Sequence, residues 1–126
     1  MTRVLVCGGR NYHNRDMVNT ILNQAHADRN FTCLIHGAAM GADRLGFWWA
    51  LAHQRGYPAF EILGFPADWE RYGGSAGAIR NSQMLKEGQP DLVIAFPGGR
   101  GTKDMIEKAR RAGVEVVEIH DPTAIR

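Results

Sequence analysis

The sequence predicts one α/β domain over residues 1–126, a doubly wound, mostly parallel five-stranded Rossmann-like sheet of strand order 3-2-1-4-5 with helices on both faces. Two observations predict this fold. Short apolar runs of strand length alternate with longer segments whose apolar residues recur at helical spacing, which is typical of a parallel sheet covered on both sides. Three glycine-rich turns also each follow an apolar run and precede a helical segment, as turns at the carboxyl edge of such a sheet do.

The expected strands are short and apolar. RVLVC and LVIAF are continuously hydrophobic apart from Arg3, as strands buried on both faces are. PAFEI contains a proline, which has no amide donor, so we expect this strand near an edge of the sheet. In chain order the strands are expected at residues 3–7, 32–36, 58–62, 92–96 and 114–119.

Helical segments are expected between these strands, at residues 15–28, 43–55, 78–87 and 102–112. Asn14, Asp43 and Thr102 stand at three of the expected helix starts, and each has a side-chain oxygen that can cap free N–H groups. Residues 63–77 are expected to form a long ordered loop, and such loops in small domains are often binding loops.

The composition is that of an ordinary soluble domain, with 44% hydrophobic and 22% charged residues and a formal net charge of +2. No run of Lys and Arg indicates a nucleic-acid surface, and no apolar run approaches the roughly 20 residues of a membrane span. Cys7 and Cys33 fall in expected strands, where they are read as small buried hydrophobes. We expect a cytoplasmic protein without metal or cofactor.

The three glycine turns are expected to meet at one edge of the sheet. In this strand order the connections reverse direction between the first and fourth strands, and ligands bind beyond the carboxyl ends of strands there. Glycine lets the backbone approach a ligand closely, and a helix N-terminus attracts phosphate. The turns therefore predict a nucleotide or phosphorylated-metabolite pocket, with candidate residues Gly8, Gly9, Arg10, Gly37, Gly41, Asp43, Pro97, Gly98, Gly99, Arg100, Gly101 and Thr102.

Each of these residues also has a simpler structural interpretation. The glycines can merely permit tight turns, and Arg10 and Arg100 can be solvated surface charges. Thr102 can cap its helix and donate its hydroxyl to a phosphate at the same time. Asp43 can cap the second helix, accept hydrogen bonds from a ribose diol, or align His36, and His36 itself is read as structural before it is read as a catalytic base.

The 63–77 loop adds aromatic rings and carboxylates. Trp69 or Tyr72 can stack on a base, although Trp69 is read first as an anchor of the loop to the core. Asp68 and Glu70 place carboxylates near the expected pocket mouth. A carboxylate opposite an anomeric carbon stabilises the positive charge that develops during N-glycoside hydrolysis.

The second expected helix is apolar over much of its circumference. Helical spacing groups four of its residues in one stripe and puts two more on another side: Leu45, Trp48, Trp49 and Ala52, then Phe47 and Leu51. A helix of this kind is deeply buried or packs on a partner. In a chain of this size, we expect a homodimer or a higher homo-oligomer with its interface on this helix.

Four sequence blocks resemble a known superfamily. CGGRNY, HGAAMGAD, PADWERYGGSAGAIRN and AFPGGRGT occur in this order and are similar to the YspA-related branch of the SLOG superfamily, which also includes the DprA/Smf DNA-processing proteins. PGGRGT also resembles the PGGxGT signature of the Lonely Guy (LOG) phosphoribohydrolases. The resemblance implies a Rossmann-like domain that binds a nucleotide or nucleotide-derived ligand and commonly dimerises. It adds Arg80 and Asn81, whose segment resembles the LOG arginine block, to the candidate residues.

One departure from the LOG pattern leaves two functions open. The LOG signature continues to a glutamate, PGGxGTxxE, which works with an upstream arginine to cleave the ribosyl–base bond. Here Met105 takes that place, and Asp104 lies about 100° around the helix from it. The missing glutamate favours a module that senses or sequesters a nucleotide-derived signal. The alternative is a LOG-like nucleotide hydrolase that uses Arg80 together with Asp104, Asp68 or Glu70. DNA handling, as in DprA, is disfavoured by the small net charge.

Overall fold

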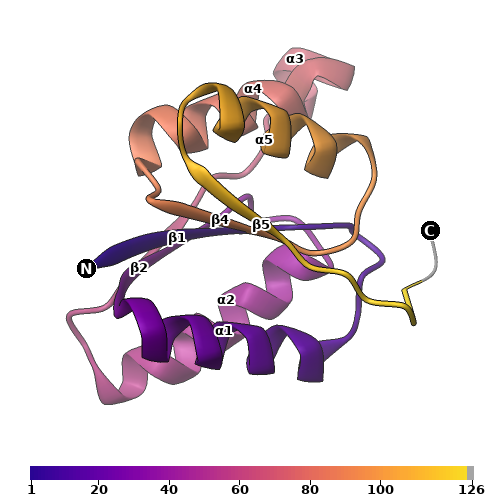
Figure 1. The fold of residues 1–126 in the computed structure, drawn as a ribbon. Helices are drawn as coiled ribbons and strands as arrows, with labels where there is room; N and C mark the ends of the chain where they lie inside the picture. The colour runs from indigo at the N-terminus through magenta and orange to yellow at the C-terminus, as the bar shows by residue number, and fades with distance from the viewer. Residues whose placement is uncertain (125–126) are drawn as a thin grey trace.

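A five-stranded sheet of order β3-β2-β1-β4-β5 forms the centre of the structure, a computed structural model that describes residues 1–124 (Figure 1). All four strand pairs are parallel. The strands are β1 (Thr2–Cys7), β2 (Phe31–His36), β3 (Glu61–Gly64), β4 (Leu92–Ala95) and β5 (Glu115–Glu118). The predicted fold class and strand order are confirmed.

Two helices cover one face of the sheet and three lie over the other (Figure 1). On the first face are α1 (Arg15–Arg29) and α2 (Ala42–Gly56); on the second are α3 (Trp69–Tyr72), α4 (Ala76–Gln83) and α5 (Arg100–Arg111). A 3-10 turn at Gly73–Ser75 leads into α4, and a π turn at Met84–Gly88 follows it. The chain changes face between β3 and β4, so the connections reverse at the β1–β4 boundary.

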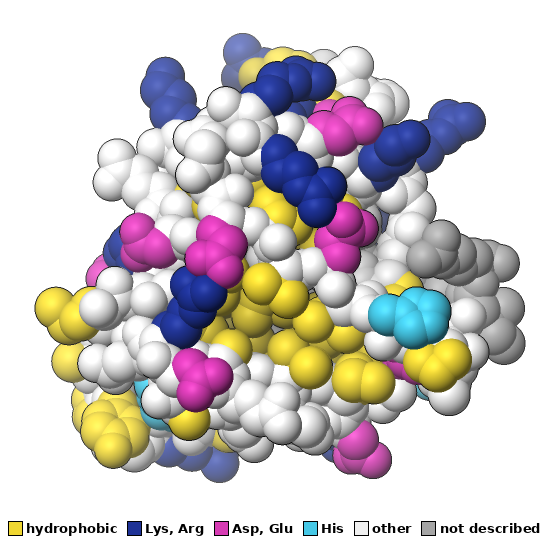
Figure 2. Space-filling model, viewed as in Figure 1, with side chains coloured by type: hydrophobic (Ala, Val, Ile, Leu, Met, Phe, Trp, Pro, Cys, Tyr) yellow, Lys and Arg dark blue, Asp and Glu magenta, His cyan; other side chains and the backbone are white. Residues whose placement is uncertain are grey.

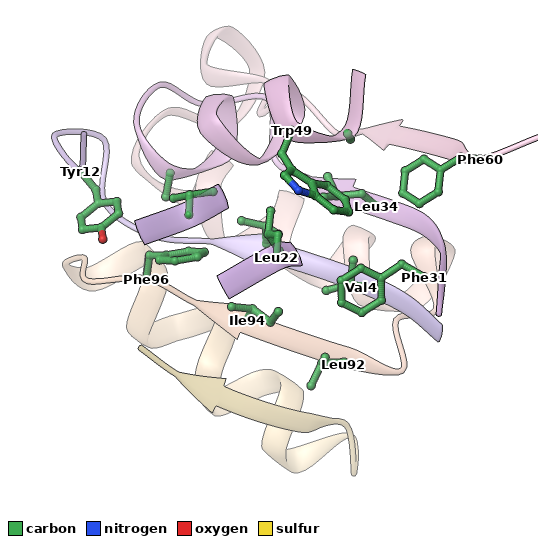
Figure 3. Packing of buried hydrophobic residues seen from close by; sticks show 14 residues of the cluster. Val4, Tyr12, Leu22, Phe31, Leu34, Trp49, Phe60, Leu92, Ile94 and Phe96 are labelled. Carbon is green, nitrogen blue, oxygen red and sulfur yellow. The ribbon is translucent and has the colours of Figure 1, made fainter. Parts of the chain in front are cut away.

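The strands bury both of their faces, and the core therefore has two halves. In β1, Val4 and Val6 pack toward α1 and α2, and Leu5 and Cys7 pack toward α4 and α5. This alternation explains why the strand is continuously apolar in sequence. Figure 3 shows the first half, which includes Leu22, Leu34, Trp49, Ile94 and Phe96.

The two edges of the sheet differ from the sequence prediction in detail. The third strand begins at Glu61, later than predicted, because residues 57–60 form a turn in which the Phe60 N–H donates to the Tyr57 carbonyl at 2.9 Å. Its edge position is confirmed. At the other edge, Val117 of β5 is 38% exposed, and Figure 2 shows a band of apolar surface between the two layers. Residues 63–77 are not a continuous loop, since they contain α3 and the turn after it.

The starts of α2 and α5 also correct the prediction. Asn14 caps α1, because its side chain accepts from the Met17 N–H at 3.1 Å. The N-caps of α2 and α5 are instead Gly41 and Gly99, without a side-chain cap. Predicted caps Asp43 and Thr102 lie inside the first turns, because each helix begins directly after its glycine turn. In residues 1–124, we find no helix with the length and apolarity that crossing a membrane requires.

Candidate functional site

The three glycine turns meet at Gly9, as the strand order predicts. The Gly9 N–H donates to the Pro97 carbonyl in the β4–α5 turn at 2.8 Å. The Gly9 carbonyl accepts from the N–H of Ala42, the first residue of α2 directly after the β2–α2 turn, at 3.2 Å. One residue of the β1–α1 turn thus joins the backbones of the other two turns at the carboxyl edge of the sheet.

Most of the candidate glycines are closed in by neighbouring protein atoms. Gly41 has φ +77°, and a Cβ there would lie 2.1 Å from the Gly9 carbonyl oxygen. A Cβ on Gly98 would lie 2.2 Å from Thr102 Oγ1 and 2.7 Å from the Gly9 backbone nitrogen. A Cβ on Gly37 would lie 2.8 Å from Asp43 Oδ2. Packing of the turns on one another therefore requires these glycines, whatever the turns bind.

Gly99 and Gly101 have the opposite surroundings. A Cβ on either residue would meet no heavy atom within 4 Å among those described. Both lie at the start of α5, which has no side-chain cap and no acidic residue in its first turn. The first N–H groups of α5 therefore have no side-chain cap, and the helix dipole favours an anion there.

Arg80 and Arg10 place two guanidinium groups beside this helix start. Arg80 reaches in from α4, where its Nε donates to Asn81 Oδ1 at 3.1 Å and its Nη1 donates to the Gly37 carbonyl. Nη2 makes no hydrogen bond to any residue of 1–124. Arg10 lies over the Trp69 ring, 5.0 Å from its centroid. In the part of the chain described, neither arginine forms an ion pair.

The two cations and the Trp69 ring are close neighbours. A Cβ on Gly77 would lie 3.6 Å from Trp69 Cη2 and 3.9 Å from Arg80 Nη2, so the ring and the guanidinium flank the same point. Burial and the charge of Arg10 lower the pKa of Arg80, although Asp43 acts in the other direction. Figure 2 shows that most of the visible Lys and Arg side chains gather on this layer, over α3, α4 and α5. An anion bound here would relieve the repulsion between Arg10 and Arg80.

Asp43, in the first turn of α2, contributes a buried carboxylate. It is 5% exposed, and its Oδ2 accepts from the Gly37 N–H at 3.0 Å and the Ala39 N–H at 3.4 Å. Burial raises its pKa to about 6, and the charge of Arg80 limits the rise. Asp43 Oδ1 makes no hydrogen bond within residues 1–124. Every fully buried side-chain oxygen in these residues does have a hydrogen-bond partner. Oδ1 therefore reaches the surface.

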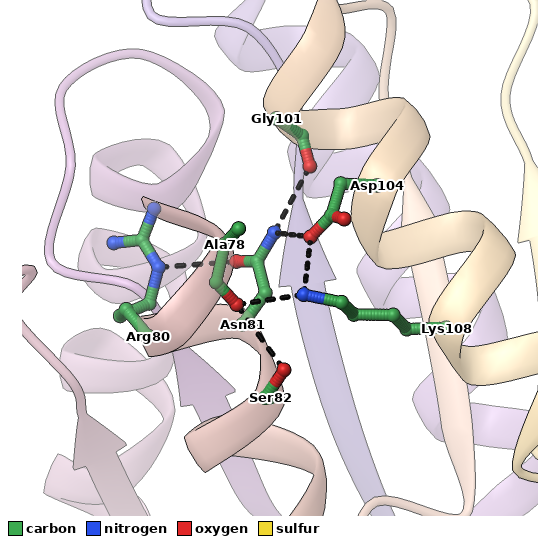
Figure 4. Close-up of polar contacts among 7 residues, drawn as sticks. All are labelled: Ala78, Arg80, Asn81, Ser82, Gly101, Asp104 and Lys108. Atoms are coloured by element: carbon green, nitrogen blue, oxygen red, sulfur yellow. Dashed lines mark hydrogen bonds and ion pairs between the residues drawn. The ribbon is translucent and has the colours of Figure 1, made fainter. Parts of the chain in front are cut away.

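Asn81 and Asp104 join α4 to α5 (Figure 4). The Asn81 amide donates to the Gly101 carbonyl and to Asp104 Oδ2, both at 3.1 Å. The same Asp104 oxygen forms an ion pair with Lys108 at 3.0 Å. These contacts hold the start of α5 at a fixed position beside Arg80, and they engage one oxygen of the Asp104 carboxylate.

The loop carboxylates and Trp69 lie farther out. Asp68 caps α3, because its Oδ1 accepts from the Arg71 N–H at 3.1 Å. Glu70 is exposed, with no hydrogen bond or ion pair within the described chain. The interpretation of Trp69 as a core anchor is wrong: the residue is 47% exposed, because α3 lies outside the core layer and its ring contacts Arg10.

Three other residues take structural positions. His36 is buried, and its Nδ1 accepts from the Ala38 N–H at 3.0 Å; burial lowers its pKa, so the ring stays neutral. Met105, at the position of the LOG glutamate, is fully buried among the side chains between the sheet and α5. Burial raises the pKa of the Cys7 thiol, which makes it a poor nucleophile.

A cleft of about 570 Å³ opens on the α1 side of the Gly9–Pro97 contact. One wall is formed by residues 9–16, another by Pro97–Gly99, and the third by Asp121, Thr123 and Ala124 of the C-terminal segment. The sequence analysis missed the third wall. The polar residues after the last strand were the available signal, but nothing in the sequence shows that this segment returns to the β1 turn.

The fold and this edge together define a Rossmann-like protein with a cleft at the carboxyl ends of its strands. The model of the YspA, cpYpsA-related SLOG family matches residues 2–72. The chain is also similar to the Gene 61 protein of Mycobacterium phage D29, with 35% identity over 125 residues that cover 96% of this chain and 98% of that protein. The chain therefore belongs to the YspA, cpYpsA-related SLOG family, as its sequence blocks predict. This membership suggests binding of a nucleotide-related small molecule, and the name of the phage protein states no activity.

Proposed function

We propose that the protein binds a nucleotide or nucleotide-derived ligand at the carboxyl edge of its sheet and acts as a module that senses or sequesters it. The observation that carries this proposal is the pair of neighbouring guanidinium groups, Arg10 and Arg80, without an ion-pair partner among residues 1–124 and beside the uncapped start of α5. A phosphate fits this arrangement, since it binds both guanidinium groups and helix N-termini.

The remainder of the ligand has a surface beside the phosphate position. The exposed Trp69 ring, already stacked against one cation, offers a flat face for a base. The free Oδ1 of Asp43 can accept a hydrogen bond from a ribose hydroxyl, as the sequence analysis predicts. The open backbone at Gly99 and Gly101 leaves room for the phosphate oxygens.

Binding of AMP tests this proposal. AMP is expected to raise the melting temperature of the wild-type protein, because a ligand that binds only the native state stabilises it. Arg80→Gln and Arg10→Gln are each expected to remove most of this shift. Arg111→Gln is the matched control, since Arg111 is an exposed arginine at the far end of α5. If no compound of a nucleotide panel shifts the melting temperature, the binding function is refuted.

A second candidate function, nucleotide N-glycosidic hydrolysis, is supported by one feature of this site. The Asp43 carboxyl has a pKa near 6 and lies close to Arg80, so it can exchange a proton near neutral pH. Of the carboxylates predicted from the sequence, Asp104 is bound to Asn81 and Lys108, Asp68 caps α3, and Glu70 is free at the surface. These contacts favour Asp43 as the partner of Arg80 in such a reaction.

Release of free base distinguishes the two functions. A hydrolase would release base from AMP or another nucleotide of the panel, and Asp43→Asn would lower turnover about 10²–10³-fold while AMP still bound. Asp104→Asn, Asp68→Asn and Glu70→Gln are compared in the same assay. Binding without any base release from wild-type protein would leave the sensing module as the function.

We also propose that the protein forms a homodimer through α2. Trp48 is 54% exposed, whereas its neighbour Trp49 is 8% exposed and belongs to the core. Leu45, Trp48 and Ala52 border a groove of about 640 Å³ between α1 and α2. Sedimentation at micromolar concentration is expected to show a dimer, and Trp48→Asp is expected to shift it toward monomer. A monomeric wild-type protein at all concentrations would refute this interface.

A further inference from the structure

The C-terminal segment is tied across the sheet by one carboxylate. After β5 the chain runs back along the carboxyl edge of the sheet, toward the start of α1 (Figure 1). There Asp121 Oδ2 accepts from the Tyr12 hydroxyl at 2.7 Å and from the Asn14 amide at 2.9 Å. Oδ1 accepts from the N–H and the hydroxyl of Thr123, at 2.9 and 2.6 Å. These bonds lower the pKa of Asp121 and leave it ionised at neutral pH.

This clamp builds a wall of the α1-side cleft. Asp121 is 5% exposed, although it lies beyond the last strand. The ring of Tyr12, whose hydroxyl donates to Asp121, stacks on Phe96 at a centroid distance of 5.6 Å. The clamp is therefore attached to the hydrophobic core. The wall is therefore held rigidly, and the volume of about 570 Å³ lies in the range of roughly 300–1,000 Å³ that small-molecule sites occupy.

The cleft is continuous with the phosphate position proposed above. Arg10, Gly98 and Gly99 line it and also border the start of α5. Trp69, Arg80 and Asp43 do not line it, so it extends from the phosphate position away from the base-stacking surface. A ligand phosphate at Gly99 would therefore have a half-site on each side of it.

The lining indicates which chemical group the cleft takes. The Asp121 oxygens are already occupied by four hydrogen bonds, and the charges of Arg15 and Asp16 oppose each other in the first turn of α1. Asn11, His13 and the backbone of the β1–α1 turn supply hydrogen-bond donors and acceptors. Such a lining suits several hydroxyl groups better than a second charge or an apolar ring.

We infer that the cleft walled by the Asp121 clamp is a second half-site that takes a hydroxylated sugar group attached to the ligand phosphate. This inference rests on the proposed function, because it uses the same phosphate position. The base-side half-site then recognises the nucleoside through Trp69, and the clamp determines which group is accepted beyond the phosphate.

Three probes separate the half-sites by calorimetry: ribose 5-phosphate, AMP and ADP-ribose. Asp121→Ala is expected to weaken ribose 5-phosphate and ADP-ribose at least about tenfold, equivalent to ~1.4 kcal/mol, while AMP changes less than about twofold. Trp69→Ala is expected to weaken AMP and ADP-ribose and to leave ribose 5-phosphate unchanged. Asp28→Ala, an exposed carboxylate on α1, is the matched control.

Asn11→Trp keeps the test decisive if Asp121→Ala does not fold, because it blocks the cleft from an exposed position without touching the clamp. Equal weakening of AMP and ribose 5-phosphate by a cleft variant would overturn the second half-site, since one nucleotide would then occupy both regions. A cleft variant that binds ADP-ribose with unchanged affinity would also overturn the second half-site. If AMP binds and depends on Arg80 but ribose 5-phosphate does not bind, the inference fails and the proposed function stands. If none of the three probes binds, both fail.

Discussion

Gly41 and Gly98 differ from Gly99 and Gly101 in what surrounds them, although all four lie where a strand-to-helix turn meets its helix at the same edge of the sheet. The first pair is enclosed by backbone and side-chain atoms of neighbouring turns, and the second pair has open space where a side chain would be. The position of a glycine in such a turn is therefore not evidence that this particular residue contacts a ligand. Some of its glycines let the turns approach one another, and only the open ones leave room for a phosphate.

The largest effect on the free energy of unfolding is expected from a substitution at Gly41. Gly41→Ala would put a Cβ 2.1 Å from the Gly9 carbonyl oxygen at a backbone position with φ +77°, where a side chain alone costs roughly 1–3 kcal/mol. We expect the free energy of unfolding, measured by urea denaturation, to fall by at least about 3 kcal/mol. Gly101→Ala is the matched control and is expected to change it by less than about 1 kcal/mol. Similar losses in both variants would break the distinction between enclosed and open glycines.

An intermediate effect on the free energy of unfolding is expected from the titration of Asp43, the buried carboxylate that contacts the β2–α2 turn. The pKa of Asp43 is raised from 3.8 to about 6, so the native state holds this proton more tightly than the unfolded state. The free energy of unfolding should therefore fall as pH rises from about 4 to 6, by up to about 3 kcal/mol. Asp43→Asn keeps an acceptor for the Gly37 and Ala39 N–H groups and is expected to lack this decline. Parallel pH profiles for the two proteins would contradict the buried, ionisable Asp43.

The smallest effect on folding is expected at Gly99. Gly99→Asp adds a side chain where nothing lies within 4 Å, and a carboxylate at a helix N-cap is compatible with the helix. We expect less than about 0.5 kcal/mol change in the free energy of unfolding, with complete loss of the AMP-induced melting shift because the new charge occupies the phosphate position. Gly99→Ser, also a capping residue, is the uncharged control and should keep part of the shift. Unchanged AMP binding by Gly99→Asp would show that the phosphate lies elsewhere.

The sequence predicted the positions of Asp43 and Thr102 better than their structural roles. Asp43 and Thr102 were both expected near helix starts, and both are there, but as an internal acceptor for the β2–α2 turn and as the side chain that fills the space at Gly98. Their side chains do not cap because the helices begin at the glycines themselves. Trp69 was read as an anchor, and its exposure follows from the position of α3, which local pattern does not reveal.

The sequence by itself determined the fold, because burial on both faces makes a strand continuously apolar and a parallel sheet requires helices between its strands. That alternation also predicted a doubly wound sheet, for which we expected the observed strand order and the meeting of the glycine turns at one edge. Only the tertiary structure decided which glycines are open, that Arg10 and Arg80 lie together, and that Asp121 returns to Tyr12 across the sheet. These facts depend on contacts between residues far apart in the chain, and side-chain periodicity carries no information about such contacts.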